Sequence, residues 1–248
     1  MQTVVKSYED HLAVLRLDNG PTNPIGTKLI DDLSESLVEV KRNARGMVLL
    51  GKTEFFSVGF DLPELIKFDR PAMADFLEKF NRLCLELFTA PFPTICALSG
   101  HAVAGGNILA LTCDYRYASS DKKKIGLNEL KLGLPVPYLA DMVLRHTIGN
   151  RYASQMIYSA EFMPFSDAKI IGLIDAICPP EELEAFSLER LAQIAGFSQQ
   201  AFSAAKANKV EKIKRRYEKR HKEKDEIFLD CWFSDPVQKA LQEASVKF

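Results

Sequence analysis

The chain has 248 residues, of which 47% are hydrophobic and 26% are charged, and its formal net charge is −1. This composition is typical of a globular protein with a sizeable core, and it argues against a partner that is a nucleic acid or a membrane surface. The five cysteines are dispersed without metal-ligand spacing, no signal peptide is recognisable, and no apolar run approaches the ~20 residues of a membrane span. We therefore expect a soluble protein that is located in the cytoplasm.

Apolar patterning along the first 180 residues alternates between strand-like and helix-like segments. The predicted strands lie within 11–19, 44–52, 92–100, 115–120 and 174–178, with a further short apolar run at 54–65, and the predicted helices lie within 27–43, 71–90, 105–114, 154–161 and 166–175. A repeating unit of strand, strand and helix emerges, which predicts the α/β class.

The composition changes near Pro179 and Pro180, and the chain beyond them is almost wholly compatible with helix. We expect a core of residues 1–185 and a helical C-terminal region of residues 186–248, which serves oligomerisation. Within this region, Lys206 to Lys224 holds ten lysines or arginines against three glutamates. A solvated helix with paired charges is the favoured interpretation, and a basic patch for the phosphates of a nucleotide-bearing ligand or RNA is the alternative.

Common catalytic motifs are absent from the sequence. The four histidines lie far apart, and there is no HExxH, P-loop, GxGxxG or GxSxG motif. We therefore expect no metal site, no nucleotide cofactor of these types and no hydrolase of the GxSxG type.

Two glycine turns each follow an apolar strand, "FFSVGFDL" at 55–62 and "HAVAGGNIL" at 101–109. Each turn could leave a backbone N–H without a partner at a strand-to-helix junction. Two such N–H groups aimed at one point form an oxyanion hole, and a helix beginning at Gly105 or Gly106 would add its positive dipole end. From the residues alone, a purely structural role for each turn is the stronger interpretation.

The order and separation of these turns resemble the crotonase superfamily of enoyl-CoA hydratases and isomerases. The resemblance continues through "CDYRYASSDKKKIGLNELKLGL" at 113–134 and "SDAKIIGLIDAICPPEEL" at 166–183. It implies a spiral of strand-strand-helix turns with a C-terminal helical region, assembled as a trimer or a dimer of trimers. It also implies an acyl-CoA substrate, with coenzyme A as part of the substrate rather than a cofactor.

Carried over by position, the resemblance assigns the oxyanion hole to the N–H groups of Val58 and Gly105. It assigns contacts with the acyl-CoA to both turns. The residues expected to bind substrate are Ser57, Val58, Gly59, Phe60, Asp61, Leu62, Gly105 and Gly106. The Val58 side chain is expected to narrow the acyl pocket.

Two glutamates are the hydratase signature of this family, and only one of them is present here. The first position holds Ile108, whose apolar side chain cannot activate water, and the second holds Glu129 in "IGLNE". One carboxylate is enough to take a proton from C2 of a 3-enoyl-CoA and return it at C4. The pattern therefore resembles the Δ3,Δ2-enoyl-CoA isomerases. Asn128 is either a hydrogen-bond partner behind Glu129 or only a turn residue.

Three alternatives remain. The protein could catalyse another crotonase reaction, such as hydration with a non-standard second acid near Glu64 or Asp69, or thioester hydrolysis. It could be a catalytically weak member that binds CoA or RNA. The glycine turns could also serve packing alone. Phe228, Trp232 and Phe233 are expected to make packing or subunit contacts.

Overall fold

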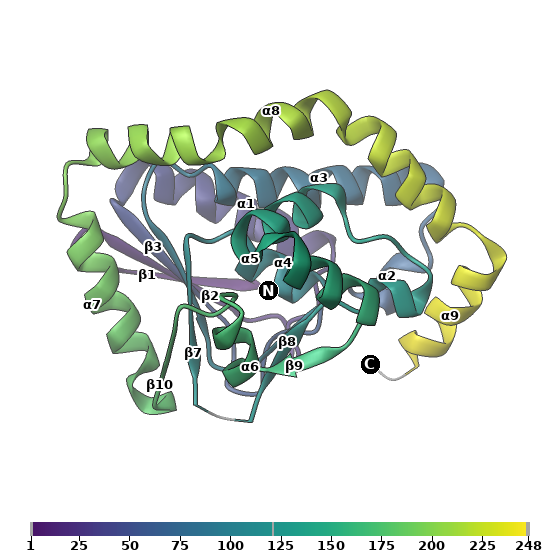
Figure 1. The fold of residues 1–248 in the computed structure, drawn as a ribbon, viewed down its shortest axis with the longest axis horizontal. Coiled ribbons are helices and arrows are strands. Elements are labelled where there is room, and N and C mark those ends of the chain that lie inside the picture. Colours follow the sequence, from purple (N-terminus) through teal and green to yellow (C-terminus); the bar gives the residue numbers. More distant parts are fainter. Residues whose placement is uncertain (1, 121, 247–248) are drawn as a thin grey trace.

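The computed structural model describes residues 2–120 and 122–246, whose strands form two sheets (Figure 1). The first sheet has the order β1 (Val4–Glu9), β2 (Leu12–Leu17), β3 (Gly46–Leu50), β5 (Thr94–Leu98), β7 (Tyr115–Ser119) and β10 (Ala176–Cys178). Only the β1–β2 pair in it is antiparallel. The second sheet has the order β4 (Phe55–Ser57), β6 (His101–Val103), β8 (Lys124–Gly126) and β9 (Phe162–Pro164).

Helices and short 3₁₀ turns connect the strands and end the chain. They are α1 (Thr27–Asn43), α2 (Leu62–Leu65), α3 (Arg70–Phe88), α4 (Gly105–Leu111), η1 (Glu129–Leu132), α5 (Tyr138–Ser159), α6 (Phe165–Ile170), η2 (Pro180–Glu182), α7 (Leu183–Ala195), α8 (Gln199–Trp232) and α9 (Asp235–Ser245). Among the described residues, no helix combines the length and the apolar character needed to cross a bilayer.

The chain repeats one structural unit as it winds. Each turn gives a strand to the first sheet, then a strand to the second, then a helix: β3–β4–α2/α3, β5–β6–α4 and β7–β8–η1/α5. The α/β class and the crotonase-like spiral are confirmed. The consequence for function is geometric, because β4–α2, β6–α4 and β8–η1 are successive junctions after neighbouring strands of the second sheet.

Local sequence signals explain where α3 begins and which face it buries. The Asp69 side chain accepts a hydrogen bond from the Ala72 N–H at 2.9 Å, which satisfies one of the free donors at the helix N-terminus. Met73, Phe76 and Phe80 then recur at helical spacing and are buried in the main core.

The C-terminal helices are integrated into the molecule. α7 packs on the face of the first sheet through Leu183 and Leu191, which join Val48 and Ile95 in a second apolar cluster. α8 runs along α3 and α5, and α9 turns back against α2 and η1 (Figure 1). The division at residue 185 stays a prediction, while the helical character of the region beyond it is confirmed.

Two elements differ from the sequence-based expectations, one in its length and one because it was missed. The helix predicted at 154–161 is the end of the much longer α5, and the left-handed backbone of Gly149 (φ 77°) kinks α5 and interrupts its periodicity. The strand β1 was not expected, because most of its side chains are exposed or half-buried and show no apolar alternation.

Candidate active site

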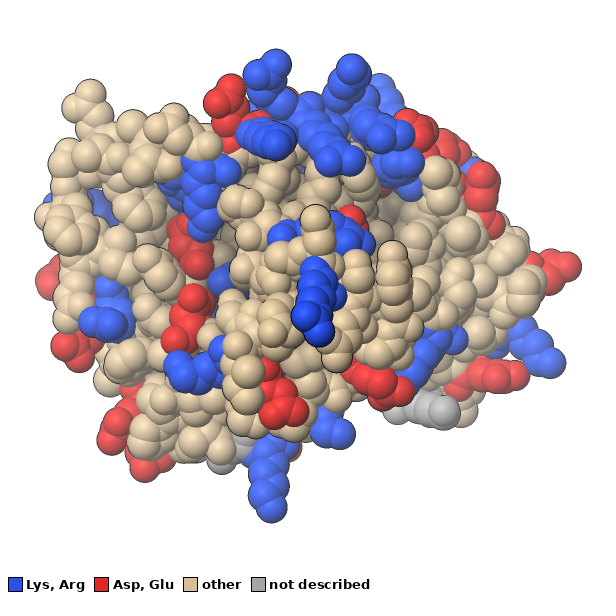
Figure 2. Space-filling model, in the orientation of Figure 1, with Lys and Arg blue, Asp and Glu red and all other residues tan. Residues whose placement is uncertain are grey.

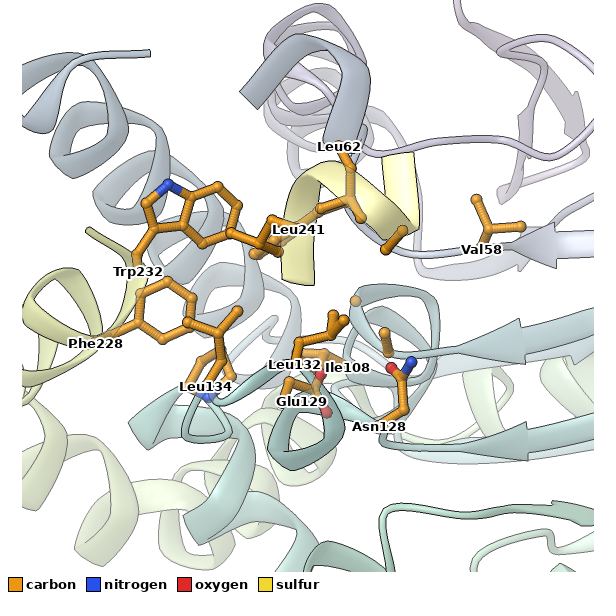
Figure 3. A pocket seen from close by; sticks show the side chains of 15 residues that line it. Val58, Leu62, Ile108, Asn128, Glu129, Leu132, Leu134, Phe228, Trp232 and Leu241 are labelled. Atoms are coloured by element: carbon orange, nitrogen blue, oxygen red, sulfur yellow. The ribbon is translucent and has the colours of Figure 1, made fainter. Parts of the chain in front are cut away.

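The two glycine turns and η1 meet at one pocket with a cavity volume of about 100 Å³ (Figure 3). Its lining is mostly apolar and comes from the β4–α2 turn, the start of α4, η1, the segment before α5, and the last two helices. The lining residues are Val58, Phe60, Leu62, Ala104, Gly105, Ile108, Asn128, Glu129, Leu132, Leu134, Pro137, Phe228, Trp232, Leu241 and Ala244.

Gly59 allows the first glycine turn to touch the second. It adopts φ +95°, which disfavours any residue with a side chain, and a Cβ there would lie 2.9 Å from the Ala104 Cβ and 3.0 Å from the Gly105 nitrogen. Gly106 is equally restricted, since its Cβ would lie 2.4 Å from the Ser57 carbonyl oxygen. The glycines are therefore required for close packing, and this packing brings the two backbones to the same pocket.

The structure corrects the assignment of one predicted oxyanion donor. The Val58 N–H already donates to the Thr22 carbonyl oxygen at 3.0 Å, so it is not free to bind a substrate oxygen. The N–H groups of Phe60 and Gly105, by contrast, donate no hydrogen bond within residues 2–120 and 122–246. Both residues line the pocket. Phe60 therefore replaces Val58 as the candidate partner of Gly105.

The backbone directly before the Gly105 N–H is strained. Ala104, which precedes it, has φ 48° and ψ −123°, an unfavourable conformation for a residue with a Cβ. Strain of this kind costs about 1–3 kcal/mol and is concentrated at functional sites. Because α4 begins at Gly105, the positive end of its dipole also faces the pocket.

Glu129 is the first residue of η1, and its carboxyl group lies in the pocket. The residue is 8% exposed, and its Oε2 atom is buried without a hydrogen-bond partner among the described residues. Burial raises the pKa of Glu129 to about 7, while the backbone N–H groups of Glu129 and Asn128 act in the opposite direction. Glu129 is therefore a carboxylate that can exchange protons near neutral pH.

The position of the other family glutamate is occupied by an apolar side chain, as the sequence indicates. Ile108 is buried on α4 and lines the same pocket as Glu129. Glu129 is the one titratable side chain in that lining, as far as the structure describes the chain. Across the same described residues, no group of three or more His, Cys, Asp or Glu side chains is arranged to hold a metal ion.

The remaining predicted contact residues divide into two groups. Val58 and Leu62 line the pocket, whereas Ser57, Gly59, Asp61 and Gly106 are not part of its lining. The Ser57 hydroxyl donates to the Asn23 carbonyl and accepts from the Gly59 N–H, and the Asp61 carboxylate caps α2 through the Glu64 N–H. Ser57 and Asp61 therefore shape the turn, and the expected contact of these residues with the acyl-CoA stays a prediction.

Part of the pocket wall was missed in the sequence. Phe228 and Trp232, one turn apart on α8, stack with their ring centroids 6.0 Å apart and line the pocket with Leu241 of α9. In Figure 3 these three side chains lie at the end of the pocket away from Val58. Their helical spacing indicated an apolar face of the helix. Which part of the molecule that face packs against is decided by the tertiary fold and cannot be read from the spacing.

The basic segment of α8 contains many paired charges. Lys and Arg side chains gather over α8 in Figure 2, and the buried Lys206 ammonium lies 2.7 Å from the Asp114 carboxylate. Further along, Arg215 pairs with Glu211 and Arg220 with Glu223. These ion pairs fit the interpretation of a solvated helix with paired charges, and the phosphate-binding alternative stays a prediction.

Comparison with known proteins agrees with this geometry. Residues 7–245 match the enoyl-CoA hydratase/isomerase family. Human mitochondrial enoyl-CoA delta isomerase 1 is 29% identical over 235 residues, covering 93% of this chain and 78% of that protein. The crystal structure of human mitochondrial delta3-delta2-enoyl-CoA isomerase superposes with a TM-score of 0.95 at 27% identity, over 99% of this chain and 98% of that one. An enoyl-CoA hydratase from Mycobacterium marinum gives a TM-score of 0.81 at 27% identity, with coverages of 92% and 96%.

Proposed function

Because the chain belongs to the enoyl-CoA hydratase/isomerase family, we propose that it moves the double bond of a 3-enoyl-CoA to give the 2-enoyl-CoA. One observation carries the choice of reaction. Glu129 is the one titratable side chain lining the described pocket, and Ile108 occupies the position where a hydratase has the first of its two glutamates. The human isomerase relatives support the same choice.

The first step is removal of a proton from C2 of the substrate. The ionised Glu129 carboxylate takes this proton, and the electron pair of the C2–H bond moves toward the thioester carbonyl to give a dienolate. The negative oxygen is then bound by the N–H groups of Phe60 and Gly105, at the positive end of α4. Stabilising this charge lowers the barrier to proton removal.

The second step returns the proton at C4. Glu129, now protonated, donates to C4 while the dienolate electrons form the C2–C3 double bond. The thioester carbonyl is restored and Glu129 is again ionised, so protons and charge balance with no water consumed. A carboxyl group with a pKa of about 7 suits both steps, since it is a stronger base than an exposed glutamate and still ionises near neutral pH.

The rival reaction, hydration, needs a second acid, and the described lining of the pocket contains none besides Glu129. Glu64 and Asp69 were the candidates for that role, but neither lines the pocket. The Glu64 carboxylate accepts from the Thr27 N–H at 3.3 Å, and the Asp69 carboxylate caps α3. Both carboxylates are engaged in the fold, which favours isomerisation over hydration.

Assembly and location complete the proposal. An acyl-CoA is the expected substrate, and a trimer or a dimer of trimers is the expected assembly. The cytoplasmic location stays a prediction, and the human relative is a mitochondrial protein by name.

The replacement Glu129→Gln tests the proposal, because glutamine keeps the shape of the side chain and cannot take a proton. We expect isomerisation of a 3-enoyl-CoA to fall by roughly 10²–10⁴-fold, with a much smaller change in KM. The assay follows the absorbance of the conjugated 2-enoyl thioester. The matched control is Glu161→Gln, an exposed carboxylate paired with Lys131. Activity retained in the Glu129 variant, or equal loss in both variants, would contradict the assignment.

A further inference from the structure

The side chain of Asn128 is unused by the fold. The residue stands at the position before η1 where asparagine often caps a helix, yet its side chain makes no capping hydrogen bond. Its Oδ1 atom is buried and has no hydrogen-bond partner in residues 2–120 and 122–246. Buried acceptors in folded proteins are normally paired, so an unpaired one in a pocket indicates a missing donor. This observation disfavours the interpretation of Asn128 as a turn residue.

Asn128 and Glu129 supply the polar side chains of the pocket apart from the indole N–H of Trp232, which is also buried without a partner among the described residues. Figure 3 shows Asn128 and Glu129 on the same side of it, among Ile108, Leu132 and Leu134. The Glu129 Oε2 atom is also buried without a partner among the described residues. Two oxygen acceptors cannot bond to each other while the carboxylate is ionised. A proton on Glu129 turns its carboxyl group into a donor, and a single hydrogen bond can then satisfy the proton and the amide oxygen.

We propose that Asn128 is a positioning residue whose Oδ1 accepts a hydrogen bond from the Glu129 carboxyl group while Glu129 holds the proton removed from the substrate. This inference rests on the proposed function, because that reaction makes protonated Glu129 an intermediate. The bond holds the carboxylic acid in one orientation between the loss of the proton from C2 and its return at C4. It favours the protonated form of Glu129 over the ionised form.

The residues around Asn128 and Glu129 allow the titration of Glu129 to be followed without interference from other titratable groups in the pocket lining. The side chains that line the pocket with Glu129 carry no titratable group: Ile108 from α4, Phe228 and Trp232 from α8, and Leu241 from α9. Lys131, in the same 3₁₀ turn, is half-exposed and pairs with Glu161 at 2.6 Å. A shift in the titration of the site after replacement of Asn128 therefore reports on Asn128 and Glu129.

The test uses the variants Asn128→Ala and Asn128→Asp, with Lys131→Gln as the matched control in the same turn. The Ala variant removes the acceptor, so the acidic limb of the kcat/KM profile moves lower by about half to one pH unit. We also expect kcat to fall about tenfold, with KM within about twofold of the wild type. The Asp variant places a second carboxylate beside Glu129, so the limb moves to higher pH. The control leaves the profile unchanged.

A titration without turnover separates this inference from the proposed function. The carboxyl band of Glu129 is followed by infrared difference spectroscopy, assigned with Glu129→Gln, in the wild type and in both Asn128 variants. A lower titration midpoint in the Ala variant supports the proposal even if the wild type fails to isomerise 3-enoyl-CoA. An unchanged or raised midpoint in a folded Ala variant overturns it. If the Ala variant fails to fold, an unchanged midpoint in the Asn128→Asp variant overturns it instead.

Discussion

Glu129 is stabilised in its neutral form by its surroundings, and this has a consequence for stability. Its pKa in the folded protein is about 7, above the ordinary value of 4.5, so the folded state holds the proton more tightly than the unfolded state. The cost of ionising Glu129 is absent below pH 4.5 and grows as the pH rises toward 7. By the linkage relation this cost is at most about 3 kcal/mol above neutral pH.

The variant Glu129→Gln should therefore be more stable than the wild type at pH 8 and nearly equal to it at pH 5. We expect a gain of about 1–3 kcal/mol at the higher pH, because glutamine carries no charge to bury. Urea unfolding at the two pH values measures the difference. An equal effect at both values would mean that the carboxylate is not buried as described. The gain in stability together with the loss of activity would mark Glu129 as a functional residue.

Backbone donors were harder to assign than side chains. Glu129 and Gly105 could be predicted because their motifs place them, and the structure brings them to one pocket. Val58 was assigned in place of Phe60 because nothing in the local pattern reveals that the Thr22 carbonyl takes the Val58 N–H. Which N–H stays free depends on a contact between segments 36 residues apart in the sequence.

At the scale of elements, α8 and α9 complete the pocket that the spiral begins. Trp232 and Leu241 are fully buried and line the end of the pocket away from Val58 (Figure 3). The contact of α9 with α2 and η1 places Leu241 over the site, beside Trp232 at the end of α8. The helices are therefore expected to limit the length of the acyl chain as well as to stabilise the fold.

Replacement of Trp232 by Ala should enlarge the pocket and shift the substrate preference toward longer acyl chains. Removing a buried indole should also cost about 3–5 kcal/mol of stability, so Leu241→Ala, at about 2–5 kcal/mol, serves as a second variant. The measurement is kcat/KM for a series of 3-enoyl-CoA esters of increasing length. Phe197→Ala, at a position 68% exposed, is the control. An unchanged preference in both pocket variants would show that the acyl chain leaves by another route.

The predicted elements were most accurate where burial follows a simple pattern. The strands β3 and β5 are buried along their whole length and were recognised as continuous apolar runs. Three-residue strands such as β8 and β9 are too short to show a period, and their pairing is decided by the spiral. The same limit applied to the part of the pocket wall that α8 forms. An apolar face can be recognised in the sequence, but the sequence pattern does not show which surface it packs against.

For the whole molecule, assembly is the remaining structural expectation. Family resemblance predicts three copies, or six as a dimer of trimers. Light scattering after gel filtration should give a mass near three or six times the 27.8 kDa of one chain. A mass of one chain at micromolar concentration would contradict this expectation. The pocket lining described above comes from a single chain, so the test concerns the assembly and leaves the assignment of Glu129 intact.

The central claim is that one carboxylate carries one proton from C2 to C4 without adding water. The most direct measurement supplies 3-enoyl-CoA deuterated at C2 and analyses the product by NMR and mass spectrometry. We predict 2-enoyl-CoA as the product, with part of the deuterium at C4 because Glu129 returns the label before complete exchange with solvent. A product that carries a hydroxyl group at C3, formed from this ester or from 2-enoyl-CoA, would contradict the claim.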